Sequence, residues 1–108
     1  MIRALFVCGA NKLRSPTAEQ IFSQWPGVDV DSAGLNNDAE QQLSAEQIAW
    51  ADIIFVMDKA QMKRVRRQFM RAAAGKKIIC LDIADNYAFM QPELVRLLEL
   101  RAGHHLRR

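Results

Sequence analysis

The stretch FVCGANKLRSPTAE, residues 6–19, joins a compact apolar run to the start of a helix. The apolar run covers residues 2–7 and is followed by Cys8. Pro16 suits the first position of a helix, because its fixed φ is helical and the N–H it lacks would have no partner there. Ser15, just before it, is predicted to be the N-terminal cap. The stretch therefore predicts a strand, a short loop and a helix in direct succession.

The remainder of the chain alternates apolar runs with helical patterns in the same way. The predicted strands cover residues 2–7, 28–34, 52–57 and 77–81. The predicted helices cover residues 15–25, 36–51 in two pieces, 58–74, and a last helix that opens at Pro92. Caps are expected at Ser44, with Gln47, and at Asp58, with Gln61. Apolar strands without clean alternation are typical of a buried parallel sheet. We expect an α/β fold over residues 1–108, a single domain whose four-stranded parallel sheet carries helices on both faces.

Length, composition and charge exclude several classes of protein. The chain has 108 residues, a formal net charge of +3 and a hydrophobic content of 50%, as an ordinary globular domain does. Its apolar runs are short, such as residues 53–57, whereas a membrane-spanning helix needs about 20 apolar residues. No secretory signal is recognisable. Two cysteines, Cys8 and Cys80, cannot build a disulfide scaffold. We therefore expect a cytoplasmic protein that does not cross a membrane.

Positive charge is concentrated in residues 59–77. This segment holds eight basic residues and no acid, whereas the rest of the chain has seven basic and twelve acidic residues. One interpretation is a solvated helix face. The alternative is weak, non-specific binding of polyanions, nucleic acid included. Phe69 is the one aromatic residue among these charges, so the segment offers no evident stacking platform for bases.

The loop after the first strand has the features of an oxyanion cradle. Its backbone N–H groups and the positive end of the following helix can converge on one anion. Arg14 can grip two oxygens of a phosphate, and the same positive field favours the thiolate form of Cys8, a nucleophile aimed at phosphorus. The alternative for Cys8 is a small buried residue at the end of a strand. The predicted phosphate-binding residues are Gly9, Ala10, Asn11, Lys12, Leu13, Arg14 and Ser15.

The loop resembles the signature of the low-molecular-weight protein tyrosine phosphatases. That signature is a cysteine, five residues, an arginine, a serine and a proline after the first strand. The matching positions are Cys8, Asn11, Arg14, Ser15, Pro16, Ala18 and Glu19. Ser32-Ala33-Gly34, residues 51–58 and Asp85-Asn86-Tyr87 resemble three further family elements in the same order. The resemblance implies the flavodoxin-like, phosphotyrosine phosphatase I type of three-layer sandwich.

The resemblance also implies a role for each residue of the loop. Cys8 is the nucleophile and forms a cysteinyl-phosphate intermediate. Arg14 holds the equatorial oxygens and stabilises charge in the transition state. Asn11 stabilises the loop, which needs left-handed backbone that Asn tolerates. Ser15 hydrogen-bonds the thiolate, and Ser32 supports Asn11 from the second predicted strand.

The general acid has two candidates in the loop after the fourth predicted strand. Asp85 aligns with the family's acid and is favoured over Asp82, which directly follows the strand. Asp58 is interpreted as a helix cap. Tyr87 is expected to line the substrate cleft. Asn86 replaces the proline of the family pattern, so the resemblance does not determine how closely this loop approaches the cradle.

Several departures from the family bear on the substrate. The segment between the second and third predicted strands is short and lacks an aromatic residue, so the pocket for a tyrosine ring looks reduced. The sequence predicts a phosphate-monoester hydrolase, with a phosphotyrosine protein as the first candidate substrate and phosphate, sulfate or vanadate as ligands. Alternatives are a non-catalytic phosphate-binding or polyanion-binding module and an arsenate reductase, for which Cys80 would be the second thiol. No metal or organic cofactor is implied, and His104 and His105 are taken as incidental residues of a frayed tail.

Overall fold

Four parallel strands form the centre of the structure, a computed structural model that describes residues 1–107. They are β1 (Ile2–Cys8), β2 (Val28–Gly34), β3 (Ile53–Val56) and β4 (Lys77–Cys80). Their order across the sheet is β2-β1-β3-β4, and every pair is parallel. The chain therefore builds outward from β1 in both directions, and the strand order reverses between β1 and β3. Ligands of open α/β sheets bind at such a reversal, beyond the carboxyl ends of the strands.

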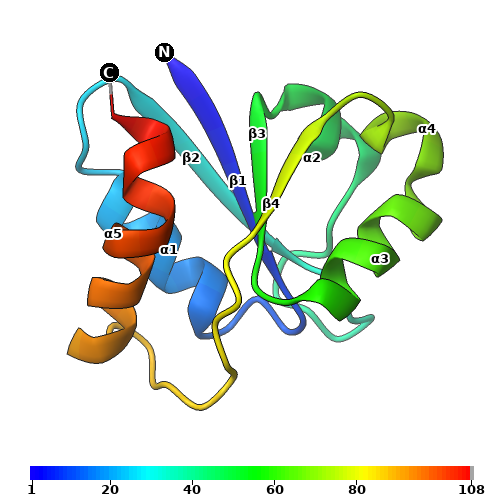
Figure 1. Ribbon diagram of the computed structural model, residues 1–108. Coiled ribbons are helices and arrows are strands. Elements are labelled where there is room, and N and C mark those ends of the chain that lie inside the picture. The colour runs from blue at the N-terminus through cyan, green and yellow to red at the C-terminus, as the bar shows by residue number, and fades with distance from the viewer. Residues whose placement is uncertain (108) are drawn as a thin grey trace.

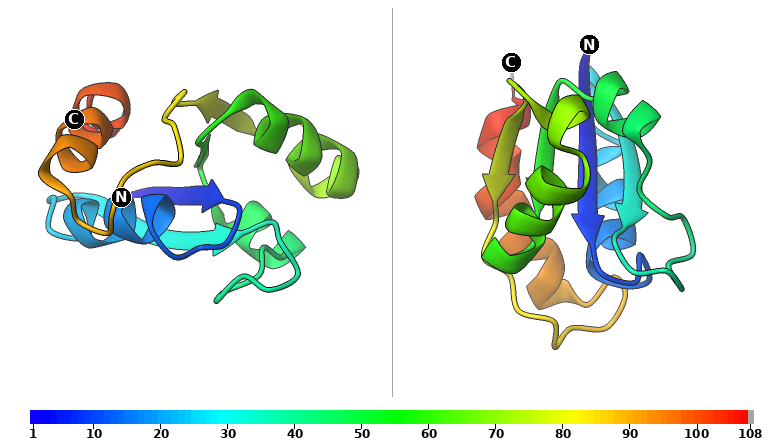
Figure 2. Two further views of the ribbon diagram at one scale, coloured as in Figure 1. Left: turned by 90° about the horizontal axis from the view of Figure 1, so that it is seen from below. Right: turned by 90° about the vertical axis from the view of Figure 1, so that its right-hand side faces the viewer.

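Helices cover both faces of this sheet, as predicted. They are α1 (Arg14–Phe22), α2 (Ala45–Trp50), α3 (Lys59–Gln68), α4 (Met70–Ala73) and α5 (Pro92–Leu106). Helices α1 and α5 lie on one face, and α2, α3 and α4 lie on the other (Figure 1). Figure 2 shows the same separation from two further directions. The α/β fold with a parallel sheet between two helical layers is confirmed.

Each face of the sheet has its own hydrophobic core, because alternate residues of a strand point to opposite faces. Phe6 of β1 stacks between Phe22 of α1 and Phe55 of β3, with ring centroids 5.4 and 4.8 Å apart. Residues Leu5 and Val7 of the same strand point into the other core. All five side chains are fully buried. Strand β1, which carries Cys8 at its end, is thus held firmly on both sides.

Two predicted helical segments differ in the structure. Residues 36–43 form turns and bends instead of the first piece of a helix. Their backbone donors and acceptors are used by the loop after β1 and by Gly34, as described below, and so cannot form a helical ladder. The predicted helix over 58–74 breaks at Phe69, whose φ of −125° and ψ of 43° are not helical, and continues as α4.

Helix ends follow the predicted chemistry at two places and depart from it at two others. Ser44 forms the predicted capping box, and Asp58 accepts a hydrogen bond from Gln61 N at 2.9 Å to cap α3. The prediction that Ser15 caps α1 is wrong, because Leu13 occupies the cap and Ser15 lies inside the first turn. The prediction that His104 and His105 lie in a frayed tail is also wrong, because α5 continues to Leu106. None of the helices within residues 1–107 has the length and apolar character that a membrane crossing requires.

Candidate active site

A cavity of about 190 Å³ opens at the carboxyl end of β1, where the strand order reverses. Cys8 lies in its wall, only 3% exposed. The lining residues are Cys8, Gly9, Ala10, Lys12, Leu13, Arg14 and Asp85. Cys8 is the last residue of β1, and five of the other six belong to the set that the sequence predicts to bind phosphate. The seventh, Asp85, comes from a distant part of the chain, and the structure brings it to the same cavity.

The loop after β1 is turned so that its carbonyl groups face away from the cavity. Backbone N–H groups of residues 35–40 donate to the carbonyls of Cys8, Gly9 and Ala10 at 3.0, 2.9 and 3.2 Å. A peptide's C=O and N–H point in opposite directions, so the N–H groups of Gly9 and Ala10 point away from this segment. Residues 35–40 therefore leave these amide donors free for an anion in the cavity.

Asn11 fixes the turn of this loop. Its φ is 56°, the left-handed conformation that the sequence predicts there. Its side chain is buried, and Nδ2 donates to Ser15 Oγ and to Ser32 Oγ, each at 3.0 Å. Ser32 lies on β2, so the loop is tied both to the first helix and to the neighbouring strand. Asn11 and Ser32 thus lie where the resemblance implies.

The direction of these hydrogen bonds is set by Glu19. Its carboxylate only accepts, so Ser32 Oγ donates to it, at 2.5 Å, and must itself accept from Asn11. The second N–H of Asn11 then donates to Ser15, whose own hydrogen is left for Cys8. Ser15 Oγ lies 2.9 Å from Cys8 Sγ. A hydroxyl held as a donor in this way stabilises a negatively charged sulfur.

Arg14 is buried beneath the cavity, 5% exposed, and is held by three oxygens. Its Nη1 donates to the carbonyl of Ile83 at 2.7 Å and lies 3.9 Å from Asp58 Oδ2. Its Nε lies 3.5 Å from Asp85 Oδ1. Within residues 1–107, Nη2 has no hydrogen-bond or ion-pair partner. The guanidinium is therefore fixed in orientation while part of its donor edge is free for a ligand.

The loop over residues 81–91 presents Asp85 and turns Asp82 away. Asp85 is 69% exposed at the cavity, whereas Asp82 is an exposed residue with a φ of 55° outside the cavity lining. Arg101 donates to the carbonyl of Asp82 at 2.5 Å, which ties that end of the loop to α5. Tyr87 is half-buried against the core that includes α1 and α5. The sequence predicts that it lines the substrate cleft, but it is not among the residues that line this cavity.

Three contributions to the site do not follow from the sequence alone. Glu19 is recognised only as a motif position, although it lies one helical turn after Ser15, a spacing that puts both on one side of α1. Asp58 is interpreted as a cap alone, yet its second carboxylate oxygen faces Arg14. The role of residues 35–40 has no sequence signal, because it depends on their backbone groups.

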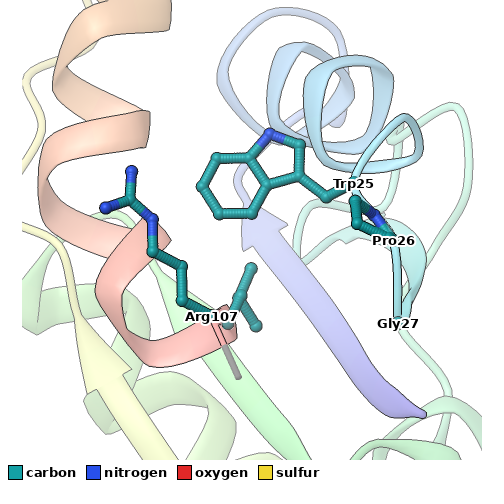
Figure 3. A pocket seen from close by; sticks show the side chains of 5 residues that line it. Trp25, Pro26, Gly27 and Arg107 are labelled. Atoms are coloured by element: carbon teal, nitrogen blue, oxygen red, sulfur yellow. The ribbon is translucent and has the colours of Figure 1, made fainter.

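A larger hollow of about 600 Å³ lies at the opposite end of the sheet. Trp25, Pro26, Gly27, Leu106 and Arg107 line it (Figure 3). The guanidinium carbon of Arg107 lies 5.4 Å from the Trp25 ring centroid, a cation–π contact. The lining contains neither a nucleophile nor an acid. Size therefore does not identify the candidate active site, and the chemistry of the lining residues does.

The structure is similar to solved structures of phosphatases, and the similarity extends over almost the whole chain. The YwlE arginine phosphatase from Geobacillus stearothermophilus is 27% identical, with a TM-score of 0.78 and coverage of 98% of this chain and 93% of the neighbour. The tyrosine phosphatase AmsI from Erwinia amylovora is 25% identical, with a TM-score of 0.76 and coverage of 100% and 95%. A low-molecular-weight protein tyrosine phosphatase from T. tengcongensis is 21% identical, with a TM-score of 0.71 and coverage of 95% and 94%.

These neighbours confirm that the chain resembles the low-molecular-weight protein tyrosine phosphatases and has their α/β fold. No protein-family model matches the sequence, and no curated protein matches it. The roles of individual residues in this chain therefore rest on the geometry of its own site.

Proposed function

We propose that this protein is a cysteine-dependent phosphate-monoester hydrolase. The observation that carries the proposal is the surroundings of Cys8 Sγ. It is buried in a cavity wall, 2.9 Å from a hydroxyl that acts as a donor, in a loop whose amides and Arg14 suit an oxyanion. Phosphotyrosine in a protein is the substrate to test first, and phosphate, sulfate and vanadate are the ligands expected at the loop after β1. The cytoplasm is the proposed compartment.

The proposed reaction has two steps. In the first, the Cys8 thiolate attacks phosphorus, the P–O bond breaks, and Asp85 gives its proton to the departing oxygen. In the second, water loses a proton to the Asp85 carboxylate and attacks phosphorus, and the P–S bond breaks. Phosphate leaves and the thiolate is restored. Arg14 and the loop amides bind the equatorial oxygens through both steps, and Ser15 stabilises the leaving thiolate.

An arsenate reductase is less well supported. That chemistry needs a second thiol to resolve the adduct on the first. Cys80 is half-buried on β4, two strands away from β1, and packs against the other core. Cys8 belongs to the core on the opposite face, and neighbouring strands lie about 4.8 Å apart. The two sulfurs therefore have a sheet between them.

Hydrolysis of p-nitrophenyl phosphate tests the proposal against the remaining alternative, a non-catalytic phosphate-binding module. We expect turnover by the unaltered protein and none by Cys8→Ser, because a neutral hydroxyl is a far weaker nucleophile than a thiolate. Binding of inorganic phosphate, measured by calorimetry, should persist in Cys8→Ser because Arg14 and the loop amides remain. Phosphate binding without turnover in the unaltered protein would indicate the binding module.

A further inference from the structure

Helix α3 carries a continuous row of cations along one side. Lys59, Lys63, Arg66 and Arg67 are all exposed. At 3.6 residues per turn these positions fall within about 100° of arc, so they form one face, here called the cationic stripe. Val65, on the other side of the helix, is fully buried. The stripe is therefore held toward solvent by the packing of the helix on the sheet.

The charge of the stripe is not neutralised within the described chain. Residues 59–77 contain no Asp or Glu. The ion pairs found among residues 1–107 involve only Arg3 and Arg14 as cations. A row of like charges without partners is unfavourable for folding and increases the attraction of an anionic ligand. The complement of this face is a run of carboxylates or phosphates.

The stripe begins at the rim of the candidate active site. Lys59 directly follows Asp58, whose carboxylate lies 3.9 Å from Arg14 Nη1. Arg64 fastens α3 to the segment that holds the phosphate loop, because it donates to Asn36 Oδ1 and to the carbonyl of Leu35, each at 3.2 Å. Figure 1 shows α3 starting beside the loop after β1 and running away from it. These contacts fix the position of the stripe relative to the cavity.

An exposed apolar side chain, Met70, lies just beyond the far end of the stripe. Met70 is 71% exposed at the start of α4. Two hollows, of about 380 and 210 Å³, flank it. Their lining includes Arg66, Arg67, Arg71 and Ala73. An apolar side chain could rest on Met70 while acidic neighbours face the arginines. A nucleic acid fits this surface less well than an acidic peptide does. Phe69, the aromatic residue of residues 59–77, packs against the core and so offers no exposed ring on which a base can stack.

We propose that the cationic stripe binds an acidic segment of a phosphoprotein substrate, next to the phosphorylated residue held at Cys8. The inference rests on the proposed function and names its substrate class. Helix α3 has ten residues and is therefore about 15 Å long. An extended chain covers that length with about five residues. The substrate carries Asp or Glu within about five residues of its phosphorylated residue, followed by an apolar side chain that reaches Met70.

Phosphotyrosine peptides of equal length test this substrate class. One has Asp and Glu at the five positions beside the phosphotyrosine, and its match has Asn and Gln. We expect kcat/KM to be about five- to tenfold higher for the acidic peptide, the size that a few exposed ion pairs supply together. The preference should act mainly through KM and weaken in 0.5 M salt, where the charges are screened.

Two substitutions of equal charge locate the effect. Lys63→Glu reverses a charge on the stripe, whereas Lys77→Glu makes the same change at the start of β4, at the other end of the sheet. We expect the acidic-to-neutral ratio of kcat/KM to fall about fivefold in Lys63→Glu and to stay unchanged in Lys77→Glu. Equal losses in both variants would reduce the effect to net charge and overturn the proposal.

A binding measurement separates this proposal from the proposed function. An unphosphorylated acidic peptide, with and without its apolar residue, is titrated into Cys8→Ser and read by fluorescence anisotropy. Saturable binding that Lys63→Glu weakens would support the stripe even if p-nitrophenyl phosphate were not hydrolysed. No binding, or tighter binding of a single-stranded oligonucleotide at 0.15 M salt, would overturn it.

Discussion

At the scale of the residue, the two candidate acids differ in what surrounds them. Asp85 reaches the cavity beside Arg14, and Asp82 lies outside it with its carbonyl held by Arg101. Protonation of the leaving group matters most when the departing oxygen is basic. We expect Asp85→Asn to slow phenyl phosphate hydrolysis by about 10²–10⁴-fold and p-nitrophenyl phosphate hydrolysis much less. Steady-state rates on the two esters check this.

Asp82→Asn is the matched control for this prediction. It makes the same chemical change three residues away, and it should reduce both rates equally, through the position of the loop. A leaving-group dependence confined to Asp82→Asn would transfer the acid role to that residue. If neither variant shows the dependence, a water molecule or a group on the substrate supplies the proton.

The sequence predicted the local chemistry of single residues better than their second contacts. The left-handed turn at Asn11 follows from the preference of Asn for that conformation and was confirmed. The cap at Asp58 follows from spacing and was also confirmed. The proximity of Asp58 to Arg14 could not be predicted, because it depends on how the end of β3 is placed beside the end of β1. A carboxylate has two oxygens, and a local signal explained only one of them.

At the scale of the element, the end of β2 packs closely against the loop after β1. Gly34 pairs with Cys8, and a Cβ at Gly34 would lie 2.5 Å from the carbonyl oxygen of Gly9 and 3.0 Å from Asn11 N. Both are backbone atoms, so the loop itself must shift. We expect Gly34→Ala to weaken phosphate binding at least tenfold and to lower the free energy of unfolding by about 1–3 kcal/mol.

Calorimetry with phosphate and thermal unfolding check this prediction, with Gly75→Ala as the control. Gly75 has a φ of 75° and no atom within 4 Å of the added Cβ, so its substitution strains the backbone far from the loop. Gly75→Ala should lower the melting temperature and leave phosphate affinity unchanged. Equal phosphate affinity in Gly34→Ala and the unaltered protein would show that the loop accommodates the methyl group.

Elements with strong periodic patterns were predicted well, and those shaped by their neighbours were not. All four strands, the helices after Ser44 and Asp58 and the helix that begins at Pro92 have local signals that the structure agrees with. Helix α1 also forms, but it begins at Arg14, so Pro16 is its third residue and not its first. Residues 36–43 have a helical composition, but their backbone hydrogen bonds go to the loop after β1 and to Gly34. Ser15 is a residue type that often caps helices, but its hydroxyl faces Cys8. In both cases a tertiary contact of the site replaced the local preference.

At the scale of the whole molecule, α5 joins the far end of the chain to the central sheet. His105 lies near its end, with its ring centroid 5.8 Å from that of Phe55 on β3 and 4.0 Å from that of His104. Burial lowers the pKa of His105 below its usual 6.5, and repulsion from His104 and Lys77 lowers it further. The folded protein thus disfavours the charged ring, whereas the unfolded chain accepts a proton normally.

This difference predicts the pH dependence of stability. Above pH 6.5 the ring is neutral in both states and its contribution to stability is complete. As the pH falls below 6.5, the unfolded chain binds the proton first, so the free energy of unfolding decreases until the pH passes the lower pKa of the folded state. Asp52, whose carboxylate accepts a hydrogen bond from Arg3 N, has a pKa lowered from 3.8, so its stabilising contribution is complete above that range and is lost only as the pH falls below it. Urea unfolding at pH 7.5, 6.0 and 5.0 therefore isolates His105.

His105→Phe should flatten this dependence, because it keeps an aromatic ring against Phe55 and cannot take up a proton. His104→Gln, at an exposed neighbouring position, is the control and should keep most of the dependence. The comparison is made between slopes, because the new ring also changes packing and shifts every point by a similar amount. An equal loss of stability between pH 7.5 and 5.0 in His105→Phe and the unaltered protein would assign the dependence to other groups. It would also mean that α5 gives its histidine no more shielding from water than the unfolded chain does.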